Sequence, residues 1–169
     1  MKLLRAAVIA AIGMTVLACS PQGDGANGAD KGAVDAKELK RAKKVVERRE
    51  AVMGLMGWST GPMSGMVKGD APYDAEVFTR QARRLAGLSE MSADLFKADV
   101  RGFDLHTEAK PEIWDDYEDF AKLAQDLVDS SNALVAASQS GDLAVASQAF
   151  KEVADDCKAC HDKYKEDDH

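Results

Sequence analysis

The chain has 169 residues, a formal net charge of −7 and a hydrophobic fraction of 46%. An acidic balance argues against nucleic acid as a partner, because phosphate backbones are bound by basic surfaces. About 135 residues remain after the two N-terminal segments described next, which is enough for one domain with a core of ordinary size.

Residues 1–18 have the pattern of an export signal. Lys2 and Arg5 make the start basic, and residues 6–18 form an uncharged, mostly apolar run that is too short to span a membrane. The junction Ala18-Cys19 resembles a lipobox, so we expect Cys19 to become a lipidated mature N-terminus; cleavage after Ala18 without lipidation is the alternative. We therefore expect a periplasmic protein, anchored to a membrane if Cys19 carries a lipid. Loss of the signal would take the net charge from −7 to −9.

Residues 19–33 are rich in Gly, Asn and Asp, which predicts a flexible tether in front of a domain at 34–169. The first predicted helix of that domain spans about 35–57, because apolar residues recur at helical spacing. A stretch rich in Gly, Pro and Met, residues 58–72, is expected to end it. The apolar positions of this first helix are Leu39, Ala42, Val46, Met53 and Met56.

The second predicted helix begins after Asp74, a suitable N-cap, and continues to about residue 96. Residues 97–110 are expected to form a long connection. The third helix starts at Pro111, since proline suits the first helical turn, and carries apolar residues inward as far as Leu134. Residues expected on the buried side of the second helix, or as core or cofactor packing elsewhere, are Val77, Phe78, Ala82, Leu85, Leu88, Met91, Trp58, Ile113, Trp114, Tyr117 and Phe120.

Gly141 and Asp142 predict a short turn with Asp142 as the cap of a fourth helix, which runs to about residue 164. No segment alternates as a strand does. Four helices joined by short and long connections predict an all-α fold, an antiparallel four-helix bundle.

The last predicted helix carries Cys157-Lys158-Ala159-Cys160-His161, the spacing of a c-type haem attachment site. Two thiols at i and i+3 and an imidazole at i+4 share one helix face, so they can hold the haem covalently and reach its iron. A structural zinc site would need four ligands, and a thioredoxin-like pair would follow a strand; neither condition is met. The sequence thus predicts one covalently bound haem c.

The chain resembles the class II cytochromes c, the cytochrome c′ family, over about residues 35–165. The resemblance is carried by Arg49-x-x-x-Met53, Met66-Val67-Lys68-Gly69, Ala71-Pro72-Tyr73-Asp74, Pro111-Glu112-Ile113-Trp114, Gly141-Asp142, and the haem motif continued by Asp162-Lys163-Tyr164. It implies that His161 is the proximal iron ligand and that Arg49 lies near a haem propionate. Lys165 stands where the family often has arginine, which changes the donor geometry on the proximal side.

The same resemblance places Met53 on the distal side of the haem, and two outcomes follow. If the Met53 sulfur binds iron, the protein is a low-spin, high-potential electron carrier that serves periplasmic or membrane redox proteins; this is the outcome we expect, with no enzymatic turnover. If Met53 only packs over the iron, the site is five-coordinate and binds NO or CO. Met56 is the competing methionine. The family includes homodimers formed through the first two helices, and the many charges of the first helix leave dimerisation open here.

Overall fold

The computed structural model describes residues 35–167, which contain helices and turns but no strand. Four helices are long: α1 (Ala36–Lys68), α2 (Ala75–Ser89), α5 (Tyr117–Ser138) and α6 (Leu143–Tyr164); two are short: α3 (Ser92–Phe96) and α4 (Glu112–Asp115). The predicted signal at 1–18, the tether at 19–33, Cys19 and His169 lie outside the described residues. Within 35–167, no helix combines the length and the apolar character that crossing a membrane requires.

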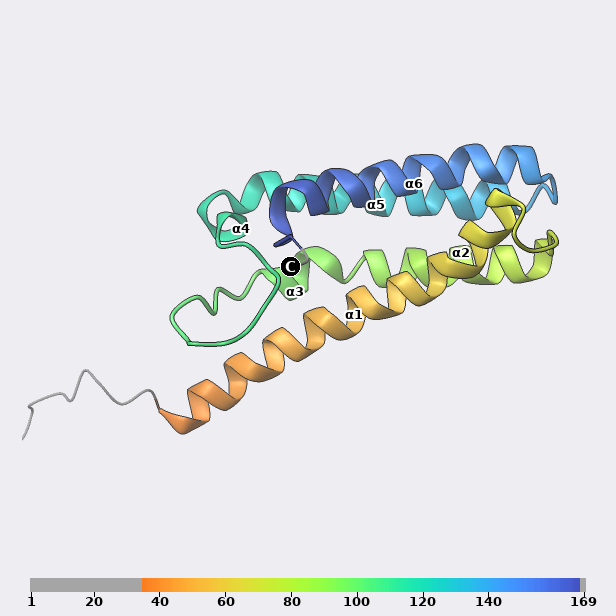
Figure 1. Cartoon of the computed structure of the whole chain (residues 1–169). Helices are drawn as coiled ribbons and strands as arrows, with labels where there is room; N and C mark the ends of the chain where they lie inside the picture. Colours follow the sequence, from red (N-terminus) through yellow and green to blue (C-terminus); the bar gives the residue numbers. More distant parts are fainter. Residues whose placement is uncertain (1–34, 168–169) are drawn as a thin grey trace, which may run out of the picture. The chain divides into compact units, whose positions relative to one another are not determined.

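The four long helices pack as an antiparallel bundle, which confirms the predicted fold class. Helix α5 packs extensively on α6 and on α2, and α2 also packs on α1. Figure 1 shows α5 and α6 lying side by side, with α1 and α2 beside them. Short turns join α1 to α2 and α5 to α6, and a long connection that carries α3 and α4 joins α2 to α5, so neighbouring helices run antiparallel.

Two clusters of buried side chains form the core. The larger cluster joins α1, α2, α5 and α6 and includes Met63, Phe78, Leu85, Leu134 and Val153. The smaller cluster lies around the ends of α3, α4 and α6 and consists of Phe96, Ile113, Phe120, Ala124 and Tyr164. Met53 of α1 packs against both clusters, so it lies where they meet.

Helix α1 does not end near residue 57, and the predicted break at residues 58–72 is wrong. The helix continues through Pro62 to Lys68 and ends at Gly69, whose φ of 80° is left-handed. Buried residues recur at helical spacing beyond residue 57: Met56 (7% exposed), Ser59 (0%), Met63 (0%) and Met66 (7%). Their burial in the core outweighs the low helix propensity of glycine and proline.

The second predicted helix is divided, because α2 ends at Ser89 and α3 begins at Ser92. Ser89 donates a hydrogen bond from its hydroxyl to the Ala86 carbonyl (2.8 Å) inside the last turn of α2. Met91, expected on the buried side, is 50% exposed in this break. The prediction for Trp58 was also wrong. We expected it in the core or the haem pocket, and it lies on the surface with 56% of its area exposed.

The third predicted helix is divided too, at Asp116, whose φ of −139° and ψ of 74° separate α4 from α5. The Asp116 carboxylate accepts a hydrogen bond from the Asp119 backbone (3.3 Å) and so caps α5. The fourth helix follows the prediction: Asp142 caps α6 through the Ala144 backbone (2.7 Å), after Gly141 with its φ of 70°.

Candidate haem site

Helix α6 brings the two thiols and the imidazole of the haem motif to one side of the bundle. Cys157 packs at the edge of the larger core cluster and Cys160 at the edge of the smaller one. Both are partly buried, and neither forms a disulfide. Their i, i+3 spacing on a helix keeps both sulfur atoms on the same face as His161.

A cavity of about 130 Å³ lies beside this face of α6. His161 reaches its lining although it is exposed to solvent, so the imidazole lies at the mouth of the cavity. The remaining walls come from α1, from the end of the connection before α4, and from the smaller core cluster. The lining residues are Arg49, Glu50, Met53, Phe96, Thr107, Glu108, Ala109, Ile113, Phe120, Cys160, His161, Tyr164 and Lys165.

The end of α6 is fastened to the connection that closes this cavity. The Lys110 backbone donates to the Tyr164 carbonyl (2.9 Å), and the Glu166 backbone donates to the Glu108 carbonyl (2.8 Å). The Tyr164 hydroxyl donates to the Asp119 carboxylate of α5 (2.6 Å). These bonds fix the last turn of α6, and with it His161, against two other segments.

Arg49 is the buried charge of the site, with only 3% of its surface exposed. Its Nε donates to the Leu95 carbonyl (3.0 Å) and its Nη2 to the Ala98 carbonyl. The guanidinium also lies over the rings of Phe96 (4.8 Å) and Trp114 (4.9 Å). Its Nη1 is buried without a hydrogen-bond acceptor, and burial lowers the pKa of Arg49.

The titratable groups of the motif are shifted towards their neutral forms. Burial raises the pKa of the Cys160 thiol to about 11 and also raises that of Cys157. Burial lowers the pKa of His161, and the neighbouring Lys165 lowers it further. A neutral imidazole is the form that binds a metal ion.

The structure separates the two competing methionines. Met53 lines the cavity together with His161, whereas Met56 is 7% exposed in the larger core cluster and does not reach the cavity. His106, which the sequence did not favour as a ligand, is exposed in the connection. Within residues 35–167, no group of three or more His, Cys, Asp or Glu side chains is placed to hold a metal ion by itself.

The side chains around the cavity fit a haem group in their chemistry. Nη1 of Arg49 is a buried cationic donor without an acceptor, and a propionate supplies the anionic acceptor that it lacks. Aromatic and aliphatic walls suit a porphyrin face, and the thiols and imidazole suit its edge and its iron. The cavity is smaller than the roughly 300–1,000 Å³ of ordinary cofactor sites, so haem insertion requires the surrounding segments to move apart.

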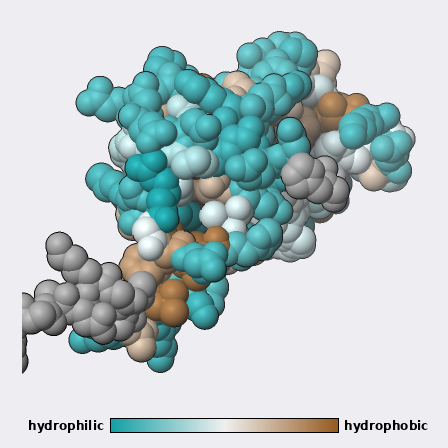
Figure 2. Space-filling view, turned by 60° about the vertical axis from the view of Figure 1, so that its left-hand side comes forward, coloured by the Kyte–Doolittle hydropathy of each residue, from teal (hydrophilic) through white to brown (hydrophobic). Residues whose placement is uncertain are grey.

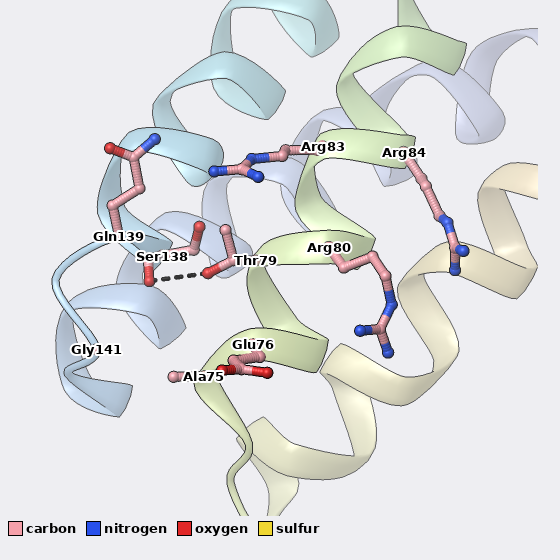
Figure 3. Close-up of a pocket in the computed structure, with 9 residues that line it drawn as sticks. All are labelled: Ala75, Glu76, Thr79, Arg80, Arg83, Arg84, Ser138, Gln139 and Gly141. Atoms are coloured by element: carbon pink, nitrogen blue, oxygen red, sulfur yellow. Dashed lines mark hydrogen bonds between the residues drawn. The ribbon is translucent and has the colours of Figure 1, made fainter.

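A second, larger cavity of about 730 Å³ lies between α2 and the turn from α5 to α6. Figure 3 shows Arg80 and Arg83 pointing in different directions from α2, and Arg84 pointing towards α1. The Arg84 guanidinium lies 4.8 Å from the centre of the Trp58 ring. No thiol or imidazole lines this cavity, so its size does not make it the haem site.

Several residues of the smaller cavity carried no signal in the sequence. Three of them belong to the long connection before α4: Thr107, Glu108 and Ala109. The path of this connection depends on its backbone hydrogen bonds to the end of α6 and the residues after it. Glu50 was hidden among the many charges of the first helix. Periodicity describes helices, and no local pattern reports where an irregular connection lies.

Three known proteins that are similar to this chain are cytochromes. Cytochrome c-554 of Cereibacter sphaeroides is 35% identical over 136 residues, covering 79% of this chain and 99% of that protein. The solved structure of cytochrome c prime from Shewanella frigidimarina matches with a TM-score of 0.70 and 36% identity, covering 75% and 97%. A nitric oxide complex of a cytochrome c prime variant from Alcaligenes xylosoxidans matches with a TM-score of 0.68 and 34% identity, over the same shares.

The model of the family described as Cytochrome C' matches residues 44–165, a span that holds Arg49, Met53 and the whole haem motif. The match covers most of the chain and ends just after α6. Together with the bundle, the haem-binding pattern and the relatives, it shows that this chain belongs to the cytochrome c′ family and is a monohaem cytochrome with one covalently attached haem c.

Proposed function

We propose that the protein binds a small neutral diatomic gas, NO or CO, at a five-coordinate haem iron. The observation that carries the proposal is that Met53 of α1 and His161 of α6 line one mostly apolar site. A similar cytochrome c prime has been solved as a nitric oxide complex, which supports the same ligand class here. This proposal replaces our expectation from the sequence, in which Met53 ligates the iron.

Three side chains of the haem motif each have a role. Cys157 and Cys160 would attach the porphyrin to α6 through thioether bonds, and His161 of the same helix would bind the iron. Arg49 holds a propionate through the nitrogen that has no acceptor within the described residues. Bound haem supplies an iron with one open coordination position, which is what a diatomic gas requires.

Met53 and its apolar neighbours select the ligand on the other side. Phe96, Ile113 and Phe120 exclude water and charged ligands from the cavity, because these would lose their hydration without gaining hydrogen bonds. A neutral diatomic molecule loses little hydration on entry. The Met53 side chain is flexible enough to move aside for a small ligand.

A second function is favoured by one observation, namely that a thioether lines the same cavity as the imidazole. If Met53 Sδ binds the iron, the site becomes six-coordinate and the reduction potential rises. The protein would then carry single electrons between periplasmic or membrane redox proteins. The two functions differ only in whether Met53 ligates the iron or packs beside it.

The absorption spectrum of the holoprotein, oxidised and reduced, with and without CO, distinguishes the two functions. A broad high-spin spectrum that shifts with CO is expected for gas binding. Sharp low-spin bands that do not change with CO would overturn the proposal and favour Met53 ligation.

Two methionine variants show which residue controls the binding of CO. Met53→Ala should speed CO binding roughly tenfold, which corresponds to about 1.4 kcal/mol of barrier, because it opens the distal side. Met56→Leu is the matched control, since Met56 is buried away from the cavity and should leave CO binding unchanged. If Met53→Ala instead turned a low-spin spectrum high-spin, Met53 would be a ligand.

We further propose that the protein works in the periplasm, anchored by a lipid on Cys19. The basic start, the apolar run and the lipobox-like junction of residues 1–19 support this proposal. Labelling with a radioactive fatty acid should mark the full chain and should not mark Cys19→Ala. Unlabelled wild-type protein with a mature N-terminus at Cys19 would show ordinary cleavage.

A further inference from the structure

The first half of α1 carries an unusual concentration of positive charge for an acidic protein. Residues 36–50 hold seven Lys and Arg against three Glu, whereas the whole chain has a net charge of −7. Four of the cations are spaced at i, i+4, i+7 and i+11, so they form one stripe along the helix. We call these residues the basic stripe: Lys37, Arg41, Lys44 and Arg48.

The side chains of the basic stripe form no ion pairs within the described part of the domain. All four side chains are exposed, and none has an ion-pair partner within residues 35–167. Glu38, Glu47 and Glu50 project about a quarter turn or more away from the stripe, because successive residues turn by about 100°. The charge of the stripe is therefore available to a ligand from outside.

The stripe lies on the other side of α1 from the haem site. The first half of α1 buries Ala42 (3% exposed), Val46 (6%) and Arg49 (3%), and with Met53 these residues define the inward face. The stripe is centred about 110° around the helix axis from Arg49 and about 150° from Met53. A ligand on the stripe would leave the haem cavity uncovered, which favours a positioning surface over an electron-transfer contact.

We propose that the basic stripe binds the anionic phosphodiester headgroups of a phospholipid membrane. Its cations match those headgroups in charge, and Lys37 lies only eighteen residues after Cys19, the candidate lipid acceptor. Figure 2 shows a face of the molecule that is mainly hydrophilic, with separate apolar areas.

Flotation of the full-chain holoprotein with lipid vesicles tests the proposal. Vesicles of phosphatidylcholine alone are compared with equimolar phosphatidylcholine and phosphatidylglycerol, since a lipid anchor inserts into both and the stripe prefers only the second. About 1 kcal/mol for each basic residue near an anionic surface corresponds to a preference of up to about a thousandfold. We expect at least tenfold at low salt, and its loss at about 1 M salt.

Two variants, each with four substitutions and the same change in net charge, show which residues cause the preference for phosphatidylglycerol. Glutamine keeps the helix propensity, and an unchanged haem spectrum reports an intact fold. The stripe variant, which should lose the preference for phosphatidylglycerol, is Lys37→Gln, Arg41→Gln, Lys44→Gln and Arg48→Gln. The control variant, which should keep it, is Arg80→Gln, Arg83→Gln, Lys122→Gln and Lys151→Gln.

The proposal is overturned if the wild type shows no preference for phosphatidylglycerol, or if the control variant loses as much as the stripe variant. Stripe-dependent binding to immobilised polyglutamate without a preference for phosphatidylglycerol would also overturn it and indicate an acidic protein surface as the ligand. Vesicle binding and CO binding are separate measurements, so this proposal and the proposed function can fail independently.

Discussion

Arg48 and Arg49 are neighbours on α1 with opposite surroundings, the first exposed and the second 3% exposed. Arg49→Met would leave the carbonyls of Leu95 and Ala98 without their donor and remove the stacking on Phe96. We expect it to lower the free energy of unfolding by about 2–4 kcal/mol. Guanidinium unfolding of the holoprotein, followed by haem absorbance, measures the change.

Arg48→Met is the control for this prediction, because it makes the same chemical change at an exposed position of the same helix. It should alter the free energy of unfolding by less than about 0.5 kcal/mol. Equal effects of the two substitutions would mean that the buried contacts of Arg49 contribute nothing measurable.

Asp119 joins α5 to the last turn of α6, where it accepts hydrogen bonds from Lys163 (2.7 Å) and Tyr164 (2.6 Å). These two donors hold the pKa of Asp119 below its ordinary value. A lowered pKa in the folded state stabilises the protein above the unfolded pKa of about 3.9, and this stability is lost as the pH falls through the folded pKa.

Asp119→Asn should therefore be less stable than the wild type at pH 7, with a difference that shrinks as acid protonates Asp119. Thermal unfolding of both proteins from neutral to strongly acidic pH measures this difference. A constant difference across the range would show that the carboxylate charge is irrelevant. Asp126→Asn, which removes an exposed pair with Lys122 inside α5 alone, is the comparison.

At the scale of residues, the sequence was informative where chemistry depends on local spacing. Cys157, Cys160 and His161 could be assigned because a helix alone places them on one face. Met53 and Met56 could not be separated by the same argument, since both lie on the inward side of one helix. The choice between the two methionines required the packing of the smaller cluster, because the cavity beside that cluster is lined by Met53.

At the scale of elements, α1 shows how burial overrides local propensity. Gly61, Pro62 and Gly65 predicted a break, and the helix runs through all three. Glycine costs roughly 0.5–1 kcal/mol relative to alanine at each interior position, whereas burying a methionine side chain contributes about 1.5–3 kcal/mol. Pro62 costs about 3 kcal/mol more, and the burial of Met56, Met63 and Met66 together offsets the total.

Two glycines of this region should respond to alanine with opposite signs. Gly65 is helical, and an added Cβ would meet only the Ala71 Cβ at 3.9 Å, so Gly65→Ala should raise the free energy of unfolding by about 0.5–1 kcal/mol. Gly69 has a φ of 80°, so Gly69→Ala should lower it by about 1–2 kcal/mol. Denaturant unfolding of the two single variants tests the signs, and destabilisation by both would argue against a continuous α1.

The divided second and third helices have a different cause. Breaks between α2 and α3 and at Asp116 let the Leu95 and Phe96 carbonyls face Arg49 and the Trp114 indole, which donates to Phe96 (2.8 Å). Periodicity continued across both breaks, so the sequence predicted two unbroken helices. The breaks are decided by hydrogen bonds between segments far apart in the chain, and no local pattern contains that information.

At the scale of the whole molecule, we predict a homodimer formed through the exposed apolar residues in the second half of α1. Leu55 (48% exposed) and Trp58 (56%) are large exposed apolar residues, and Gly54 and Gly57 leave open space beside them. Aromatic residues are enriched at interfaces between subunits. Sedimentation equilibrium of the holoprotein should give the mass of a dimer, and Leu55→Glu should give a monomer.

Val145 of α6, which is 46% exposed, provides the control for the dimer. Val145→Glu adds the same charge to an exposed apolar position elsewhere, so it should leave the dimer intact. A monomeric wild type would contradict the prediction outright. Dissociation by both substitutions would point to a general effect of charge and not to an interface on α1.

The sequence by itself determined the haem attachment motif, the helix that carries it, the turn before that helix and the all-α bundle. These depend on spacing, caps and periodicity, which act over a few residues. Only the tertiary structure decided that α1 continues past Pro62, that Met53 and not Met56 reaches the cavity, and that Arg49 is buried with one nitrogen unpaired. These three features depend on contacts between segments that are far apart in the chain. The burial of side chains in those contacts outweighs the conformational preference of the local sequence.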